Sequence, residues 1–149
     1  MRSDMIPAFR EGRLPRGVHE ATFQELRGRL GWGRRRAELL DGLERALRIM
    51  ESCGVARVYV DGGFVTDKPR PKDIDVCYDA REDADLVAMF PIYPTNRYTR
   101  AITIAEYGAE FFPSDMVEGA SGKPFLDFFQ TDKAGRPRGV IRIELGGER

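Results

Sequence analysis

The sequence predicts a single domain of the α/β (α+β) class. Short runs of β-branched and aromatic residues alternate with segments whose apolar residues recur every three or four positions, in the order helix, strand, strand, helix, strand, short helix, strand. The length of 149 residues fits one domain, and 42% hydrophobic residues suffice to fill a core. We expect this domain to span residues 22–149 and an N-terminal surface arm to precede it over residues 1–21.

The N-terminal part of the chain predicts the arm and two helices. Residues 1–21 contain prolines and glycines but few periodic apolar positions. Thr22 and Glu25 have the spacing of a capping box, which predicts a short helix that ends at about Leu30. From Arg34 the apolar residues follow a helical period as far as the glycine at position 54, which predicts a longer amphipathic helix.

The remaining elements follow from their residue patterns. Four segments with β-branched, aromatic or alternating residues predict strands: Val55–Val60, Asp73–Tyr78, Ala109–Pro113 and Val140–Leu145. Two segments with helical spacing predict a helix over residues 97–107 and one or two turns over residues 125–130. Residues 80–94 combine two prolines with scattered acids and favour neither structure.

Charge and hydropathy exclude several classes of protein. Lys plus Arg and Asp plus Glu both number 24, so the chain is neither a basic nucleic-acid coat nor an acidic tail. Asp4 and Glu11 interrupt the region where a signal peptide needs an apolar stretch. No apolar run approaches the roughly 18 residues of a membrane span. We therefore expect a cytoplasmic protein without membrane partners.

The few cysteines and the single histidine restrict the possible chemistry. Cys53 and Cys77 lack the spacing of a zinc site and lie in apolar contexts, so we expect buried free thiols. His19 is the only histidine, which disfavours zinc hydrolases and most nucleophiles activated by histidine. Catalysis by this chain would therefore depend on carboxylates.

Two glycines and two aspartates form the most informative pattern of the chain. Asp73 and Asp75 are two residues apart in a predicted strand, so their carboxylates project from the same face and repel each other. A divalent cation such as Mg²⁺ relieves this repulsion and is commonly shared with phosphate oxygens. Gly62 and Gly63 follow the preceding strand, and their backbone can approach a phosphate closely. The pattern indicates a site for a metal and a triphosphate.

This pattern resembles the signature of a known superfamily. Gly62-Gly63, a gap of nine residues and Asp73-Ile74-Asp75 are similar to the motif of the DNA polymerase β-type nucleotidyltransferases, particularly their minimal nucleotidyltransferase-like branch. Longer stretches, including LPRGVHEAT, DGGFVTDKPRPKDIDV and FLDFFQTDKAGRPRGVIRI, resemble an uncharacterised bacterial family near that superfamily. The resemblance implies a small mixed β-sheet with helices packed mainly on one face.

The resemblance also implies a reaction and a set of residues. The reaction is the transfer of a nucleoside monophosphate from an NTP to a hydroxyl group of RNA, protein or a small molecule, with Mg²⁺ or Mn²⁺ as cofactor. Asp73 and Asp75 match the metal-binding pair, and Gly62 and Gly63 match the turn that contacts phosphate. Many members carry serine where this chain has Gly63, and Thr66 is a nearby source of a hydroxyl.

Members of the superfamily need a third carboxylate on a later strand, which binds metal and accepts the proton of the attacking hydroxyl. We assign this role to Glu110, which lies in a short apolar strand after a predicted helix, although the superfamily usually has aspartate there. A glutamate on an edge strand that only faces water is the other interpretation. Asp127 is the rival third carboxylate, but its apolar neighbours fit one helical face and it points away from them.

Two other functions compete with an active transferase. An inactive or weakly active member would act as a binding partner or an antitoxin-like regulator, as in toxin-antitoxin systems, and the short chain favours this because it has no separate acceptor-binding domain. An RNA-binding module would use the basic cluster Arg34–Arg36. In an active enzyme, we expect a homodimer or a partner protein to complete the acceptor site.

Overall fold

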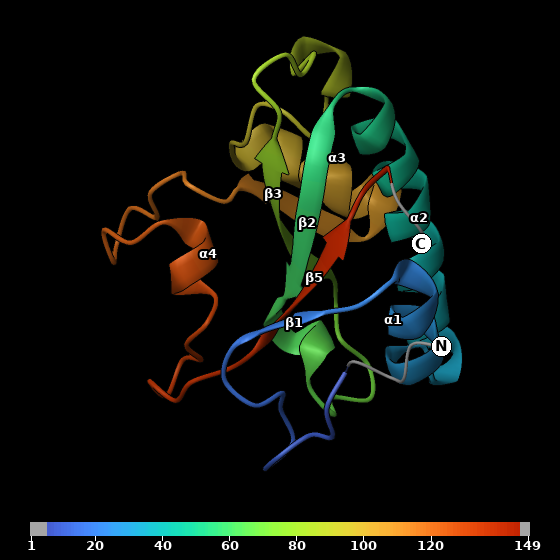
Figure 1. The fold of residues 1–149 in the computed structure, drawn as a ribbon, viewed down its shortest axis with the longest axis vertical. Helices are drawn as coiled ribbons and strands as arrows, with labels where there is room; N and C mark the ends of the chain where they lie inside the picture. The colour runs from blue at the N-terminus through green and yellow to red at the C-terminus, as the bar shows by residue number, and fades with distance from the viewer. Residues whose placement is uncertain (1–5, 147–149) are drawn as a thin grey trace.

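A computed structural model describes residues 6–146, and a five-stranded β-sheet forms their centre (Figure 1). The strands are β1 (Val18–Glu20), β2 (Val55–Asp61), β3 (Ile74–Ala80), β4 (Ala109–Pro113) and β5 (Val140–Glu144). Their order across the sheet is β1-β5-β2-β3-β4. Strand β2 is antiparallel to both β5 and β3, whereas the outer pairs β1–β5 and β3–β4 are parallel. The predicted mixed sheet is confirmed.

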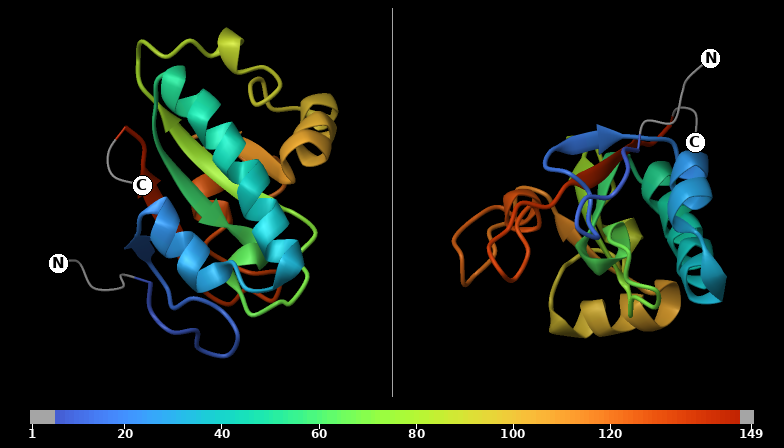
Figure 2. Two further views of the ribbon diagram at one scale, coloured as in Figure 1. Left: turned by 90° about the vertical axis from the view of Figure 1, so that its right-hand side faces the viewer. Right: turned by 90° about the horizontal axis from the view of Figure 1, so that it is seen from below.

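The long helices lie mainly on one face of this sheet (Figure 2). They are α1 (Phe23–Leu30), α2 (Gly33–Ser52) and α3 (Arg97–Tyr107), and α3 packs beside α2 at the β4 edge. The short helix α4 (Phe125–Phe128) lies on the opposite face, where Phe125 stacks on Phe112 of β4. Two 3₁₀ turns, η1 (Gly62–Val65) and η2 (Val87–Met89), complete the described elements. The helices thus leave the face that carries α4 mostly open.

Local signals explain where the helices begin and end. The Thr22 hydroxyl accepts a hydrogen bond from the Glu25 amide at 3.0 Å, and the Glu25 carboxylate accepts one from the Thr22 amide at 2.8 Å, so the predicted capping box is confirmed. Helix α3 begins after Asn96, whose side chain caps it, and ends at Gly108 with a φ of +69°. A Cβ at Gly108 would lie 2.6 Å from Leu39 of α2, so glycine also permits the close packing of α2 and α3.

The N-terminal segment differs from the surface arm that we expected. Residues Val18–Glu20 form β1, and the side chains of Ile6 and Leu14 are 2% and 1% exposed in the main core. Residues 1–5 lie outside the described residues. A three-residue edge strand leaves almost no periodic signal, and Val18 itself is 40% exposed, so the sequence pattern could not reveal it. The described part of the segment therefore belongs to the domain.

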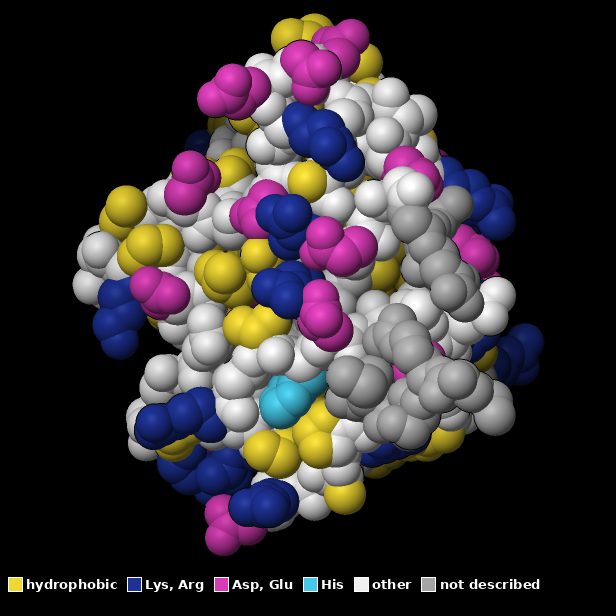
Figure 3. Space-filling view, in the orientation of Figure 1, with side chains coloured by type: hydrophobic (Ala, Val, Ile, Leu, Met, Phe, Trp, Pro, Cys, Tyr) yellow, Lys and Arg dark blue, Asp and Glu magenta, His cyan; other side chains and the backbone are white. Residues whose placement is uncertain are grey.

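The open part of the sheet is covered by charged side chains (Figure 3). Arg57 pairs with Asp79 at 3.1 Å and with Glu144 at 2.8 Å, and Arg142 pairs with Glu20 at 2.7 Å. These ion pairs cross four strands of the sheet. Each half-exposed pair stabilises the fold only slightly, but together they keep this face polar.

Most of the other predicted elements are present. Strand β4 has the predicted bounds, α3 covers the predicted residues 97–107, and β5 ends one residue earlier than predicted. Within residues 80–94, for which the sequence favoured no structure, β3 ends at Ala80 and η2 is the one further element. Both cysteines are free as expected: Cys77 is buried and Cys53 is partly buried. Among the described residues no helix is both long and apolar enough to cross a membrane.

Candidate functional site

Three carboxylates meet at the start of strands β3 and β4. Oxygen atoms of Asp73, Asp75 and Glu110 all lie within 4.8 Å of one another. Asp75 is the direct register partner of Glu110 in the parallel β3–β4 pair, and Asp73 stands two residues before Asp75. Within residues 6–146 this is the one group of three or more His, Cys, Asp or Glu side chains placed to hold a metal ion. The structure therefore brings together the three carboxylates singled out from the sequence.

Strand geometry places these carboxylates on the face opposite the long helices. Ile74 and Val76 are fully buried in the core beneath the helices, so the alternate residue Asp75 points to the other face. β3 begins at Ile74, one residue after the predicted start, which leaves Asp73 directly before the strand. All three carboxylates are only partly buried. They are therefore accessible from the open side of the sheet.

Burial and mutual repulsion disfavour ionisation of this cluster. Burial, followed by the charges of Asp73 and Glu110, raises the pKa of Asp75 to about 7. Arg138 and Arg100 oppose this rise. Burial and the charge of Glu110 also raise the pKa of Asp73. A divalent cation between the carboxylates would remove the repulsion, and hard oxygen ligands are those that Mg²⁺ and Mn²⁺ prefer.

The metal-free chain should lose stability as the pH rises through this range. The folded-state pKa of Asp75, about 7, lies above the ordinary value of 3.8, so the folded chain retains a proton that the unfolded chain loses. Its contribution to the free energy of unfolding is undiminished below about pH 4, declines between about pH 4 and 7, and stays low above that. We expect added Mn²⁺ to restore stability at about pH 8 but not at about pH 5, measured by urea unfolding. Equal effects of Mn²⁺ at both values would contradict this account of the cluster.

An arginine already contacts the third carboxylate. The Arg100 guanidinium, on α3, pairs with the Glu110 carboxylate at 2.5 Å. The Glu110 side chain is 12% exposed and that of Arg100 is 45% exposed. The pair joins α3 to β4, and the sequence pattern gave no indication of it. A metal ion that binds Glu110 must either share its carboxylate with Arg100 or displace Arg100 from it.

The glycine pair lies directly beside Asp75. Gly62 has a φ of +79°, and a Cβ there would lie 2.3 Å from the Oδ2 atom of Asp75. Glycine is therefore required at position 62 both by backbone conformation and by space. At Gly63, a Cβ would be in ordinary contact with Lys68, 3.6 Å from its Cδ atom. Position 63 thus has room for a side chain.

Substitutions at the two glycines should have opposite consequences. We expect Gly62→Ala to lower the free energy of unfolding by about 2 kcal/mol and to weaken Mn²⁺ binding, because the added methyl group collides with Asp75. Gly63→Ser should change stability by less than about 0.5 kcal/mol. Urea unfolding and Mn²⁺ titration measure both effects. Equal losses of stability in the two variants would show that the turn is generally intolerant and that Gly62 has no special contact.

Thr66 is not brought to the cleft as the sequence suggested. Its hydroxyl donates a hydrogen bond to the carbonyl of Gly63 at 2.5 Å and accepts one from the amide of Lys68 at 3.2 Å. The hydroxyl therefore closes the turn after η1, and Thr66 is not among the residues that line the neighbouring cleft.

Asp127 is exposed on α4 and is not in the carboxylate group, so the structure places Glu110 and not Asp127 beside Asp73 and Asp75.

A cleft of about 880 Å³ extends from Asp73 and Asp75. One side of it is formed by the glycine pair, and the other by α4 and the loop that follows it. Five basic residues line the cleft: Lys68, Lys72, Lys133, Arg136 and Arg138. Asp132 also lines the cleft and pairs with Arg136 at 3.0 Å, so the other four basic residues face Asp73 and Asp75. Cations opposite these two carboxylates suit a polyphosphate that carries a divalent metal. The basic residues after α4 were not predicted as part of the site, although the glycine- and proline-containing stretch TDKAGRPR is a detectable signal of a charged loop.

A fourth carboxylate lies on the neighbouring strand β2, next to the cluster, and was not predicted from the sequence as part of the site. Asp61 is completely buried and stands opposite Asp75 in the β2–β3 register. Neither of its oxygens has a conventional hydrogen-bond partner among the described residues, although the thiol of Cys77 lies against it. Burial, followed by the charge of Asp75, raises its pKa well above the ordinary value, because both disfavour the ionised carboxylate. The sequence feature that could have indicated its place near the site is its position directly before Gly62.

Arg36 fixes the turn that carries the glycines. Its side chain is fully buried, and its guanidinium donates hydrogen bonds to the carbonyls of Leu30, Phe64, Thr66 and Lys68 at 2.7–3.1 Å. It also stacks on Trp32, 3.8 Å from the ring centre. Burial lowers the pKa of Arg36 to about 10, which keeps it charged at neutral pH.

The basic cluster Arg34–Arg36 is therefore not the exposed RNA-binding patch that one alternative required. Arg36 is buried, and Arg35 donates hydrogen bonds to the carbonyls of Pro71 and Lys72. Arg34 alone of the three has a largely exposed side chain, 91%, and it pairs with Glu38 at 3.8 Å. Two of the three arginines thus hold the loop between β2 and β3 in place.

Comparison with known proteins identifies a family but no activity. A family model described as a family of unknown function, DUF6932, matches residues 7–144. No curated protein and no solved structure gives a match. The family description therefore assigns no chemistry to the site.

Proposed function

We propose that this chain, which belongs to the DUF6932 family, is a nucleotidyltransferase dependent on Mg²⁺ or Mn²⁺. It would transfer a nucleoside monophosphate from an NTP to a hydroxyl group of RNA, protein or a small molecule and release pyrophosphate. The observation that carries this proposal is the meeting of Asp73, Asp75 and Glu110 within 4.8 Å beside the glycine turn. The basic cleft supports it, because a triphosphate needs compensating positive charge.

The residues present fit a divalent metal. Three carboxylates supply hard oxygen ligands, and the raised pKa of Asp75 indicates a cluster in need of a cation. When bound, divalent ions neutralise the triphosphate and stabilise the negative charge on the attacking and leaving oxygens. Asp73, Asp75 and Glu110 would hold these ions, and the same cluster would orient the triphosphate next to them.

The other residues of the cleft have separable roles in this proposal. The backbone of Gly62 and Gly63 would approach the triphosphate from the turn. Lys68 and Arg138 would pair with its phosphate oxygens and with the departing pyrophosphate. Glu110 would accept the proton of the acceptor hydroxyl, as a carboxylate within reach of the reacting atoms can. Catalysis would then consist mainly of positioning and charge stabilisation.

The acceptor would come to the open side of the sheet. The described residues form one domain-sized sheet and helix assembly, without a second unit that could bind an acceptor. The proposal therefore includes a second copy of the chain or a partner protein that completes the acceptor site. The cytoplasm, where NTPs and Mg²⁺ are available, is the proposed location.

A second candidate function is favoured by the Arg100–Glu110 pair. An arginine at 2.5 Å already neutralises the third carboxylate, and this would weaken metal binding or catalysis. The chain would then bind nucleotide and metal with little or no transfer and act as a binding partner or antitoxin-like regulator. A measurement of nucleotidyl transfer distinguishes the two candidates, because only the first predicts transfer of label.

The test incubates the purified protein with each α-labelled NTP, Mg²⁺ or Mn²⁺, and a cell lysate that contains RNA and protein. The same reaction is run with Asp73→Asn and, as a matched control, with Asp127→Asn, which makes the same change at an exposed acid outside the cluster. Transfer of label by the wild type and Asp127→Asn, but not by Asp73→Asn, supports the transferase. If NTP and metal stabilise the protein but no label is transferred, the result supports the second candidate. If NTP and metal cause neither label transfer nor stabilisation, the result contradicts both candidates.

A further inference from the structure

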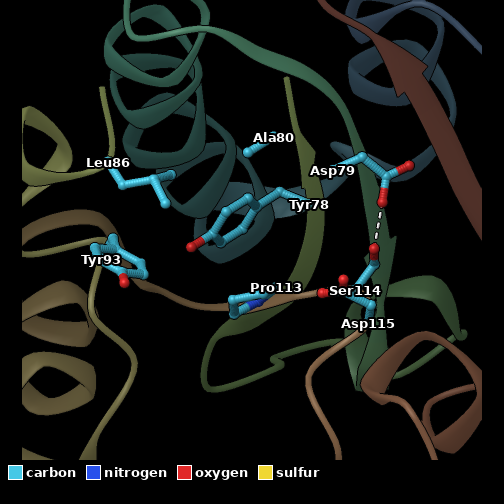
Figure 4. A pocket seen from close by; sticks show the side chains of 8 residues that line it. All are labelled: Tyr78, Asp79, Ala80, Leu86, Tyr93, Pro113, Ser114 and Asp115. Atoms are coloured by element: carbon cyan, nitrogen blue, oxygen red, sulfur yellow. Dashed lines mark hydrogen bonds between the residues drawn. The ribbon is translucent and has the colours of Figure 1, made fainter. Parts of the chain in front are cut away.

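A second pocket lies at the opposite ends of the two strands that carry the carboxylate cluster. It has a volume of about 370 Å³ and is lined by residues from the ends of β3 and β4 and from the loop that contains η2 (Figure 4). Asp79 lies four positions after Asp75 in the extended strand β3, which corresponds to roughly 13 Å. The pocket is therefore distinct from the proposed nucleotide cleft, and its volume falls in the range of small-molecule sites.

The hydroxyl of Tyr78 has no hydrogen-bond partner within the described part of the chain. The Tyr78 side chain is 2% exposed and its Oη atom is buried. Figure 4 shows the hydroxyl directed into the space enclosed by Leu86, Tyr93 and Pro113. A buried hydroxyl without a partner destabilises a fold, so a ligand that pairs with this atom would bring a gain in free energy.

The charge of the pocket selects the class of ligand. Its lining contains Asp79 and Asp115 but no lysine, arginine or histidine. The two oxygens of Asp79 already accept hydrogen bonds from Arg57, Tyr59 and Ser114. Asp115 is exposed at the rim, and no ion pair of its side chain is found among the described residues. An anion such as a nucleotide would be repelled, whereas a cation would be attracted.

The remaining lining suits an aliphatic ammonium group. Burial, followed by the electrostatic effects of Tyr93 and Asp115, raises the pKa of Tyr78, so its hydroxyl stays neutral and its oxygen can accept a hydrogen bond. The tyrosine rings have electron-rich faces that attract cations. Leu86, Ala80 and Pro113 provide apolar surface for a short carbon chain.

We propose that the pocket formed by Tyr78, Tyr93, Leu86 and Asp115 binds a protonated primary amine on a short aliphatic chain. The ammonium group would donate a hydrogen bond to the oxygen of the Tyr78 hydroxyl, and the Asp115 carboxylate at the rim would supply the opposite charge. The carbon chain lies against Leu86 and Pro113. This site is independent of the nucleotidyltransferase proposal and can be tested without it.

The experiment titrates the full chain with n-butylamine and with the neutral analogue n-butanol, followed by NMR chemical shifts and calorimetry. For butylamine we expect a dissociation constant on the order of 1 mM and shifts confined to residues around Tyr78 and Tyr93. Tyr78→Phe should weaken binding about tenfold, and Asp115→Asn severalfold. Tyr98→Phe, which removes a hydroxyl from an exposed tyrosine on α3, should leave binding unchanged.

Three outcomes would overturn the proposal: no binding of butylamine, equal binding of butanol, or undiminished binding by Tyr78→Phe. Tyr78→Phe removes an unpaired hydroxyl and keeps the ring, so it should fold with at least wild-type stability, which thermal unfolding checks. Asp115→Asn at the exposed rim provides a second variant that does not depend on the buried position. Two further probes distinguish the sources of the ammonium group: 1,4-diaminobutane represents a free amine, and Nα-acetyl-lysine amide represents a lysine side chain.

Discussion

Asparagine in place of Asp75 is expected to abolish the proposed nucleotidyl transfer while stabilising the metal-free protein. The substitution removes one ligand of the carboxylate cluster, and we expect transfer to fall at least about 1000-fold, which corresponds to about 4 kcal/mol of transition-state stabilisation. The same change removes a negative charge that burial and the charges of Asp73 and Glu110 disfavour. A rise in pKa from 3.8 to about 7 corresponds to roughly 4 kcal/mol at most, so a gain of a few kcal/mol is expected at about pH 8.

Radiolabel transfer and urea unfolding at about pH 8 and pH 4 measure the two effects. At the lower pH the wild type and Asp75→Asn should have similar stability, because Asp75 is then protonated in the folded chain. Asp127→Asn should leave both transfer and stability near the wild-type values, since Asp127 is exposed on α4. A destabilised Asp75→Asn at about pH 8 would show that the carboxylate is structural and would contradict the cluster's proposed role.

Replacement of Arg36 with methionine is expected to produce the largest loss of stability. The buried guanidinium is the hydrogen-bond donor for four backbone carbonyls, from Leu30 to Lys68, and methionine leaves them without it. We expect a loss of about 3–5 kcal/mol in the free energy of unfolding. Arg36→Lys should recover only part of this, because one ammonium group cannot reproduce the planar guanidinium fork.

The loss should extend from stability to the site, because Arg36 holds the turn that carries Gly62 and Gly63. Urea unfolding measures the first effect, and Mn²⁺ affinity at a temperature where the variant remains folded measures the second. Arg34→Met is the matched control: the Arg34 side chain is 91% exposed, and stability should change by less than about 0.5 kcal/mol. Wild-type stability in Arg36→Met would mean that other contacts, such as the 2.8 Å hydrogen bond from the amide of Asp67 to the carbonyl of Gly12, suffice to fix the loop.

The elements with strong local signals could be predicted from the sequence. The capping box at Thr22 and Glu25, the amphipathic period of α2 and the alternation of β5 each depend on neighbouring residues alone. The shared face of Asp73 and Asp75 follows from strand geometry in the same way. The position of Glu110 beside them depended on a resemblance, and the β3–β4 register provides the physical reason.

The missed features depend on contacts between distant residues. The RNA-binding alternative needed an exposed Arg36, but this side chain is buried and donates hydrogen bonds to four backbone carbonyls of other segments. The Arg100–Glu110 pair arises only when α3 packs against β4, and Asp61 stands opposite Asp75 only when β2 and β3 pair. Strand β1 was missed because three residues at a sheet edge leave no period to detect. Polar residues in particular cannot be placed from local pattern, since their environment is set by the tertiary fold.

The most direct test of the central claim is a Mn²⁺ titration of the purified protein at about pH 8 in the presence of a non-hydrolysable NTP analogue, followed by electron paramagnetic resonance. It counts bound metal without requiring an acceptor or turnover. The account predicts saturable Mn²⁺ binding by the wild type and by Asp127→Asn, and loss of that binding in Asp73→Asn and Asp75→Asn. Absence of binding by the wild type, or equal binding by all four proteins, would contradict the assignment of a metal and nucleotide site to Asp73, Asp75 and Glu110.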